Sequence, residues 1–536
     1  YEIASCLVGS EMCIRDSTST LRNLSDSTRT LLKPNLPTSH SHRMANYRQI
    51  FRSTGLLGSV QLLYILIAIL RNKVAAIFIG AAGMGLADLY ARTIELLGSA
   101  TNFGLGMSAV KQLAELCGEE EQQKEKSSAR SLRPFSSVVY KQVCVIRTWV
   151  LFTAILGTLT CLALAPLLSR WATDSPKHTE AFYLLAPMVG LTTLTSGEMA
   201  ILKATRRLRR LATATSAGAV ATLFLTSSLY AWLGVKGIVP ALVLSTAGLF
   251  VFHLQAATRD FPYHINPFCS SIVRKGLPLV RLGTAFILAG IMTSGAEMII
   301  RSALMHNQAG TALIGLYAAG LALTVSYARM IFVAMDAEYF PRLTTVLGNR
   351  RETNLTINRQ INSLIVLMAP FLLIFCLFLP LIVRLLYTEE FLDIIPMVIC
   401  AAPFMYFKAI YTPIAYLPLA HGDSVRYMTM EFIYNVVFCI AVIVGFTYGG
   451  LWGAGIGLTL ANLFDLLLIS LSYSLHYGYC MNADTLRRSV LLLFPLLTGL
   501  YCAWHPSFPL RIAGGSCCLL LMVALSWSVF KRIKRR

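Results

Sequence analysis

Apolar runs long enough to cross a bilayer recur along most of the chain, and short polar loops separate them. A transmembrane helix needs about 20 predominantly apolar residues. The pattern therefore predicts an all-α polytopic membrane protein with about fourteen transmembrane helices. Their expected positions are 54–70, 84–108, 142–166, 181–202, 212–233, 237–257, 277–299, 312–335, 361–385, 394–418, 430–448, 451–474, 488–504 and 510–530.

Basic residues concentrate in every second loop between the predicted helices. The loop from Lys111 to Lys141 carries six lysines and arginines, whereas each predicted outer loop carries one or two. Cytoplasmic loops of membrane proteins show this excess of Lys and Arg. The alternation, with the loop near Arg426 as its sparse exception, predicts that both termini lie in the cytoplasm.

Short sequence matches recur at a nearly constant offset and indicate an internal repeat. Leu57-Gly58-Ser59 matches Leu282-Gly283-Thr284, Leu89-Tyr90-Ala91 matches Leu316-Tyr317-Ala318, and the turn at Gly234 matches the turn at Gly450. Each repeat holds six helices, an even number, so both units enter the membrane in the same direction. The predicted parts are an N-terminal six-helix bundle, a cytoplasmic linker, a parallel C-terminal six-helix bundle, and two extra helices with a basic tail, at residues 44–258, 259–276, 277–475 and 476–536.

The first 43 residues show none of this periodicity. The chain opens on Tyr1, and YEIASCLVGSEMCIRDS resembles translated adapter or vector sequence, so we leave it out of the fold. Met44 is the expected start of the native protein. The alternative is that residues 1–43 form a disordered cytoplasmic tail.

Composition agrees with a membrane protein and narrows the function. Hydrophobic residues make up 56%, charged residues 13%, and the mean hydropathy is +0.63, whereas soluble domains carry roughly 25% charged residues. The net charge of +20 lies in loops rather than in a folded basic domain, which argues against a nucleic-acid partner. The thirteen cysteines lack metal or redox spacing, and common catalytic motifs are missing, so we expect no metal, no cofactor and no enzyme activity.

Polar residues recur at alternating steps of four and three along Gly83–Lys111, which stacks them on one helix face. Lipid rejects such a face, so it should point at protein or at a water-filled cavity. Arg92 and Glu95 either form an internal ion pair or line a cavity in which Arg92 meets an anionic substrate. In the second case Glu95 tunes that arginine or carries a proton. The members of the face are Asp88, Arg92, Glu95, Ser99 and Asn102.

Other charged residues lie within the predicted spans. Lys408 lies among aromatic residues in the predicted span 394–418. In a functional role, the aromatic rings stack on sugars and the lysine binds a phosphate. In the alternative, the lysine packs against the rings or extends through them to water. Arg281 and Arg329 lie near cytoplasmic helix ends and are further candidates for substrate binding. Glu198 and Asp465 are candidates for proton or sodium coupling. Glu297 and Arg301 are expected to form an ordinary surface-level helix pair.

Several motifs together resemble a known superfamily. The second helix opens with Gly-x-Gly-Leu-x-x-Leu-Tyr (Gly83 to Tyr90), and Gly-Leu-Tyr recurs at Gly315 to Tyr317. The predicted helix at 312–335 is followed by Tyr-Phe-Pro-Arg-Leu (Tyr339 to Leu343). Gly-x-x-Gly turns lie at the starts of the predicted helices at 237–257 and 451–474. Over residues 44–536 the chain resembles polysaccharide-unit flippases of the multidrug/oligosaccharidyl-lipid/polysaccharide exporter superfamily, the O-antigen and capsule translocases.

This resemblance implies a V-shaped pair of bundles around a central cationic cavity with alternating access. The cargo it implies is an undecaprenyl-diphosphate-linked oligosaccharide, moved from the cytoplasmic to the periplasmic leaflet of the bacterial cytoplasmic (inner) membrane for polysaccharide biosynthesis. Polysaccharide polymerase and glycosyltransferases are the implied protein partners, beside membrane lipid. The residues that the resemblance implies as the lining of this cationic cavity are Arg92, Arg281, Arg329 and Lys408.

Two alternatives remain. One is a cation-coupled multidrug or small-molecule exporter of the same fold. Helix 1 offers Ser59, Gln61 and Tyr64 instead of the acidic pattern of many drug exporters, which disfavours it. The other is a membrane-embedded glycan polymerase or ligase. That activity needs a large outer loop bearing acids or arginines, and the predicted outer loops are short.

Overall fold

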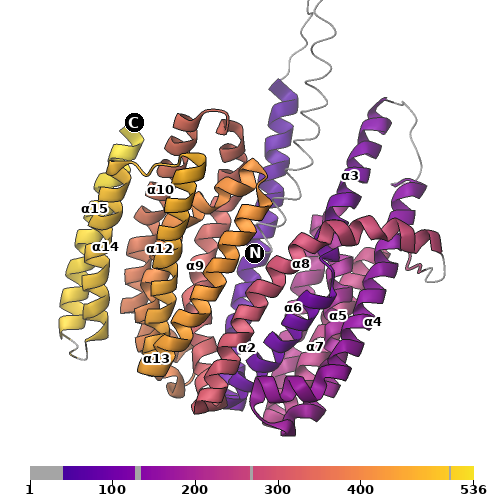
Figure 1. The fold of residues 1–536 in the computed structure, drawn as a ribbon, viewed down its shortest axis with the longest axis horizontal. Helices are drawn as coiled ribbons and strands as arrows, with labels where there is room; N and C mark the ends of the chain where they lie inside the picture. The colour runs from indigo at the N-terminus through magenta and orange to yellow at the C-terminus, as the bar shows by residue number, and fades with distance from the viewer. Residues whose placement is uncertain (1–39, 127–134, 266–269, 506, 508, 536) are drawn as a thin grey trace, which may run out of the picture. The chain divides into compact units, whose positions relative to one another are not determined.

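The computed structural model describes residues 40–126, 135–265, 270–505, 507 and 509–535, and all regular secondary structure in them is helical (Figure 1). A backbone inside hydrocarbon must satisfy its hydrogen bonds internally, and a helix does so within one segment. The α-helices are α2 (His40–Thr101), α3 (Leu105–Lys126), α4 (Ser137–Thr173), α5 (Thr179–Ala204), α6 (Leu208–Leu233), α7 (Ile238–Thr258), α8 (Ser270–Leu304), α9 (Gly310–Val346), α10 (Arg350–Leu377), α11 (Leu379–Leu386), α12 (Ile395–His421), α13 (Ser424–Tyr477), α14 (Ala483–Trp504) and α15 (Gly515–Arg535).

The predicted all-α membrane fold is confirmed. The fourteen predicted spans fall on helices apart from breaks at residues 102–104 and at Phe378, and eight helical stretches of the described chain are long and apolar enough to cross a membrane by themselves. Two of the long helices, α2 and α13, are hairpins of two arms, because Gly80 and Gly450 have φ values of 62° and 59°. Only glycine adopts such angles without strain. The excluded N-terminal segment lies outside the described residues up to position 39.

The second arm of α2 ends earlier than the sequence pattern predicts. Phe103 and Gly104 both have positive φ, which breaks the helix after Thr101. The Asn102 side chain accepts the Leu105 backbone N–H at 3.1 Å and so begins α3. Asn102 therefore lies in the turn between α2 and α3, just past the end of the polar face on α2.

Contacts divide the chain into two compact units, each described separately below. The N-terminal unit holds Tyr1–Val74, Thr93–Arg170 and Ser175–Ile291. The C-terminal unit holds Ala75–Arg92, Trp171–Asp174 and Met292–Arg536. The start of the second α2 arm thus belongs with the later helices. The predicted repeat of six helices stays a prediction, because these units are defined by packing alone.

The C-terminal unit is built around α12, the most thoroughly buried of its spans. Helix α12 packs on both arms of α13 and on α9 and α10, while α14 and α15 pack on each other and on α10 (Figure 1). Tyr406 of α12 donates its hydroxyl to the Ser489 carbonyl at 2.7 Å, which ties α12 to α14. In the N-terminal unit, α5 packs against α3, α6 and α7.

Glycine lets the second arm of α2 approach α9 at backbone distance within the C-terminal unit. A Cβ added at Gly85 would lie 1.8 Å from the Thr311 carbonyl oxygen, and one at Gly315 would lie 2.0 Å from the Ala81 carbonyl oxygen. The two Gly-containing motifs noted in the sequence therefore meet face to face. The same arm begins at Ala81, whose N–H donates to the Glu390 carboxylate at 3.2 Å.

We predict that Gly85→Ala destabilises the protein by about 3 kcal/mol, because the added methyl meets rigid backbone rather than a movable side chain. Thermal unfolding of the purified protein measures the effect. The matched control is Gly248→Ala in α7, where a Cβ meets no atom within 4 Å. That variant should keep or raise the melting temperature, since alanine favours helix over glycine. Equal melting temperatures for both variants would contradict the close contact.

Candidate functional site

Four charged side chains form one network at the meeting of the α2 second arm and α8 in the C-terminal unit. Arg301 is 1% exposed, and its Nε donates to the Asp88 carboxylate. Arg92 Nη1 lies 2.9 Å from Glu297 Oε2, and Arg92 Nε lies 3.5 Å from Asp88 Oδ1. Arg301 also donates to the Glu297 carbonyl at 2.9 Å. We call Asp88, Arg92, Glu297 and Arg301 the four-charge network.

The network changes the interpretation of two sequence features. The expected pair of Glu297 and Arg301 forms, with Arg301 Nη1 3.6 Å from Glu297 Oε2, but it is not a surface pair, because Arg301 is buried and also bonds to Asp88 of another helix. Arg92 is engaged by two acids, so its charge is compensated inside the protein. The two arginines and two carboxylates together carry no net charge, which reduces the free-energy cost of removing them from water.

Tyrosine and asparagine side chains add further polar groups to the C-terminal unit. The Arg301 guanidinium lies 5.8 Å from the Tyr317 ring centroid. Asn462 donates to the Tyr434 hydroxyl oxygen at 3.3 Å and accepts the Tyr411 hydroxyl at 3.0 Å. These side chains come from α8, α9, α12 and both arms of α13, and we refer to them as the polar track.

The acid predicted to couple ions lies beside this track. Asp465 is 4% exposed, and its Oδ1 has no hydrogen-bond partner among the described residues. The charged groups that act on its carboxylate are Glu431 and Lys408. A buried carboxylate oxygen without a donor is costly unless a proton, a cation or water satisfies it. The arrangement is suited to binding a proton or a small cation.

Lys408 is half-buried on α12, and its Nζ lies 5.6 Å from the Phe404 ring centroid. The aromatic side chains around it are packed against other residues or hydrogen-bonded to them. Phe404 and Phe407 are buried, Tyr411 bonds to Asn462, and Tyr416 packs on Phe340 at 5.5 Å. The lysine, rather than the rings, is thus the group of this cluster that is suited to meet an anion.

The remaining predicted site residues are distributed as follows. Glu95 follows Arg92 by one turn of α2 and is exposed. The side chains of Arg281 on α8 and Arg329 on α9 lie outside the described residues. The structure thus joins Arg92 to Asp88, Glu297 and Arg301, and it brings Lys408 near Asp465. The substrate roles assigned to these residues stay predictions.

Glu198, the other predicted coupling acid, forms a buried ion pair that sequence patterns hardly indicate. Arg147 of α4 donates to both Glu198 carboxylate oxygens at 2.8 Å, and both side chains are at most 4% exposed. Arg147 also donates to the carbonyls of Phe261 and Pro262 at 3.0 and 2.9 Å. The pair therefore connects the segment after α7 to α4 and α5 within the N-terminal unit. The one available signal was an arginine at the start of an apolar run.

A second contact fastens the same segment. Asp260 pairs with Arg207 at 2.8 Å and with Arg210 at 2.7 Å, both at the start of α6. The Tyr140 hydroxyl donates to the Asp260 carbonyl at 3.1 Å. No group of His, Cys, Asp and Glu side chains suited to a metal ion occurs in the described part of the chain.

Comparison with known proteins identifies the fold. A family model described as "Polysaccharide biosynthesis protein" matches residues 137–396, just under half of the chain. A lipid II flippase MurJ, in an inward closed conformation, is similar over 91% of this chain and 100% of its own, with 13% identity and a TM-score of 0.63. A multidrug resistance MATE family transporter of the MOP superfamily is similar over 78% of this chain and 94% of its own, with 16% identity and a TM-score of 0.59.

The chain has the fold of the MOP exporter superfamily. The resemblance proposed from the glycine and tyrosine motifs is thereby confirmed. A MOP superfamily transporter from Pyrococcus furiosus is also similar, over 80% of this chain and 95% of its own, with 15% identity and a TM-score of 0.55. No curated protein sequence matches the chain. Identities this low establish the MOP fold and leave the cargo to be argued separately.

In this MOP-fold protein we predict that Arg92 and Glu297 stabilise one another by about 1 kcal/mol, a value limited by their partial exposure. A double-mutant cycle of Arg92→Gln and Glu297→Gln, followed by denaturant unfolding, measures the coupling. A cycle of Arg92→Gln with the exposed Glu352→Gln is the control and should show no coupling. The same coupling in both cycles would mean that the ion pair does not form.

We predict that Arg147→Leu costs about 3–5 kcal/mol, because it leaves the Glu198 carboxylate buried without its partner. The double variant Arg147→Leu with Glu198→Leu should recover part of that loss, since no buried charge remains. Arg209→Leu, on the exposed face of α6, is the control and should change stability little. A double variant less stable than Arg147→Leu alone would contradict this account.

Proposed function

We propose that this protein is a flippase that moves an undecaprenyl-diphosphate-linked oligosaccharide from the cytoplasmic to the periplasmic leaflet of the bacterial cytoplasmic membrane. The match of residues 137–396 to a polysaccharide biosynthesis family carries the proposal. The likeness to a lipid II flippase over 91% of the chain supports it. Polysaccharide polymerase and glycosyltransferases are the proposed neighbours in the pathway, and both termini are proposed to be cytoplasmic.

The physical need for such a protein lies in the head group. Sugar hydroxyls and a diphosphate lose their hydrogen bonds with water when they enter hydrocarbon, which costs several kcal/mol for each unsatisfied group. The half-buried Lys408 offers a replacement partner within the C-terminal unit. In this proposal the isoprenoid tail stays in the bilayer, and only the head group follows the protein.

Lys408 is proposed as the group that meets the diphosphate, and Asp465 as the coupling acid. The two opposite charges act on each other in the absence of cargo. When Asp465 takes up a proton or a cation, its attraction for Lys408 ends, so the lysine attracts an anion more strongly. Arg92 is proposed to act within the four-charge network. Further proposed contacts for the head group are Glu95, Arg281 and Arg329. Glu198 is proposed as a second coupling acid.

A second candidate, a cation-coupled multidrug exporter of the same fold, is favoured by the likeness to MATE transporters. The two functions make different demands on Lys408. A cationic drug gains nothing from a lysine, whereas a diphosphate gains a charge-assisted hydrogen bond from it. Transport of the two cargo classes by one purified preparation therefore distinguishes them.

We predict that Lys408→Gln lowers translocation of the lipid-linked oligosaccharide at least about tenfold, since a hydrogen bond to a charged group contributes about 1.5–3 kcal/mol. The assay follows a fluorescent undecaprenyl-diphosphate oligosaccharide between leaflets of reconstituted liposomes. Lys236→Gln, in the turn before α7, is the control and should retain activity. Full activity of Lys408→Gln would rule out its contact with the diphosphate.

We predict that Asp465→Asn abolishes the response of transport to an imposed proton or sodium gradient. Exchange of cargo without a gradient should persist, because asparagine preserves size and hydrogen bonding but cannot take up a proton. The same liposomes, with and without the gradient, give both readings. An Asp465→Asn variant that still responds to the gradient would remove Asp465 from the coupling step.

A further inference from the structure

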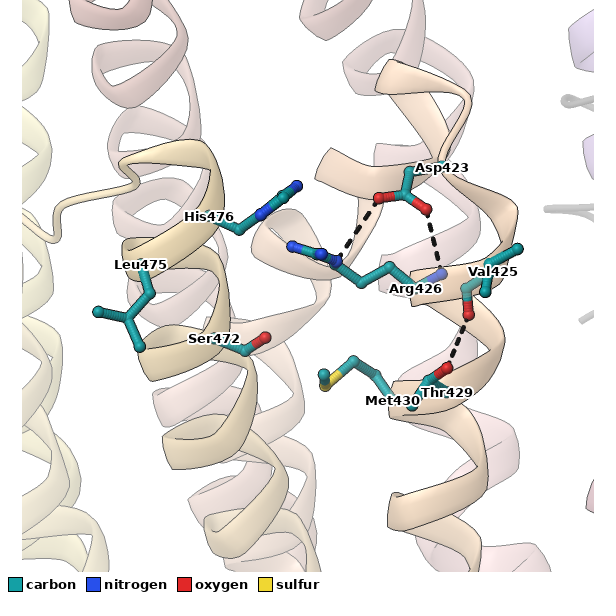
Figure 2. A pocket seen from close by; sticks show the side chains of 8 residues that line it. All are labelled: Asp423, Val425, Arg426, Thr429, Met430, Ser472, Leu475 and His476. Atoms are coloured by element: carbon teal, nitrogen blue, oxygen red, sulfur yellow. Dashed lines mark hydrogen bonds and ion pairs between the residues drawn. The ribbon is translucent and has the colours of Figure 1, made fainter.

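A pocket of about 480 Å³ lies between the two arms of α13, at the end where α12 leads into α13 (Figure 2). The first arm contributes Arg426, Thr429 and Met430, and the second arm contributes Ser472 and His476. The predicted orientation makes this the cytoplasmic end of the C-terminal unit. The volume is that of a small-molecule site.

Unused hydrogen-bond donors converge in this pocket. Figure 2 shows Arg426 and His476 reaching toward each other from opposite arms, with Ser472 one turn below His476. Among the described residues, the Arg426 guanidinium has one ion-pair contact, from its Nε to Asp423 Oδ2 at 3.5 Å, and its terminal nitrogens have no acceptor. The His476 ring and the Ser472 hydroxyl likewise have no hydrogen-bond partner in the described chain.

Asp423 supplies a fixed negative charge at the mouth of the same pocket. Its carboxylate accepts the Arg426 backbone N–H at 3.1 Å and the Tyr477 hydroxyl at 2.9 Å. Both bonds lower the pKa of the Asp423 carboxyl below its ordinary value, so it is ionised at neutral pH. Arg426 and Asp423 thus present opposite charges a few ångströms apart. A pocket with both signs is complementary to a zwitterion rather than to a simple anion.

The rim of the pocket is apolar and faces outward. Val425 is 77% exposed and Leu475 is 81% exposed, and both line the pocket. On the same arms, Leu471 and Phe432 are 64% and 56% exposed. Large apolar side chains exposed on a membrane-spanning helix contact acyl chains. Polar donors inside and apolar residues at the rim match a phospholipid, with its head group in the pocket and its chains along α13.

We propose that this pocket binds the head group of an aminophospholipid, with the phosphate on Arg426, His476 and Ser472 and the ammonium on Asp423. Guanidinium groups bind phosphate through paired hydrogen bonds. A primary ammonium donates to a carboxylate, whereas a trimethylated one has no N–H to donate. The site should therefore prefer phosphatidylethanolamine to both phosphatidylcholine and phosphatidylglycerol. It lies apart from the polar track and does not depend on the cargo.

Native mass spectrometry of the full-length protein, from nanodiscs containing equal amounts of the three lipids, tests this assignment. We expect retained phosphatidylethanolamine to fall about fivefold in Arg426→Gln, the loss of one basic contact at the membrane surface. Arg351→Gln, an exposed arginine at the start of α10, is the matched control and should retain the lipid. Equal retention by the wild type and Arg426→Gln would overturn the proposal.

Asp423→Asn tests the ammonium contact without removing the helix cap, because asparagine caps as well as aspartate. This variant should retain phosphatidylglycerol and phosphatidylethanolamine equally, and the wild type should favour phosphatidylethanolamine. A wild type that binds phosphatidylcholine as well as phosphatidylethanolamine would overturn the assignment. Excess soluble phosphoethanolamine should displace the lipid only in part, since it lacks acyl chains, and full displacement would overturn the role of the rim.

Discussion

Compensation of buried charge is the constraint on which this structure depends. Arg301 and Arg147 are both buried on apolar helices, and each meets a carboxylate from another helix. An uncompensated charge buried inside a protein costs several kcal/mol, while a well-bonded pair costs much less. The pairs consequently fix which helices lie together. Asp88 and Arg301 join the α2 second arm to α8, and Arg147 and Glu198 join α4 to α5.

The same constraint separates structural charges from candidate functional ones. Arg92 has two carboxylates around it, and Glu198 receives two hydrogen bonds from one guanidinium. Asp465 differs, because one of its buried oxygens has no donor among the described residues. Lys408 acts on it from α12. This Asp465 oxygen is why the proposed function assigns the coupling step to Asp465.

The sequence predicted the helices well because hydrophobic length and glycine turns are local properties. Gly234 and Gly450 adopt positive φ where the repeated turns were expected. Pairing between helices is not local, so the sequence showed Arg92 on a polar face but not its bond to Glu297. It likewise predicted the pair of Glu297 and Arg301 but not the burial of Arg301 or its bond to Asp88. The prediction that Asn102 belongs to the polar face was wrong, because α2 ends at Thr101 and the next two residues, Phe103 and Gly104, have positive φ.

Binding of cargo to the purified protein tests the central claim most directly. Isothermal titration of nanodisc-embedded protein compares an undecaprenyl-diphosphate sugar with a lipophilic cationic drug. We expect saturable binding of the diphosphate lipid that weakens as salt increases, because a fixed cation of the protein binds its charge. Binding of the cationic drug without binding of the diphosphate lipid would contradict it.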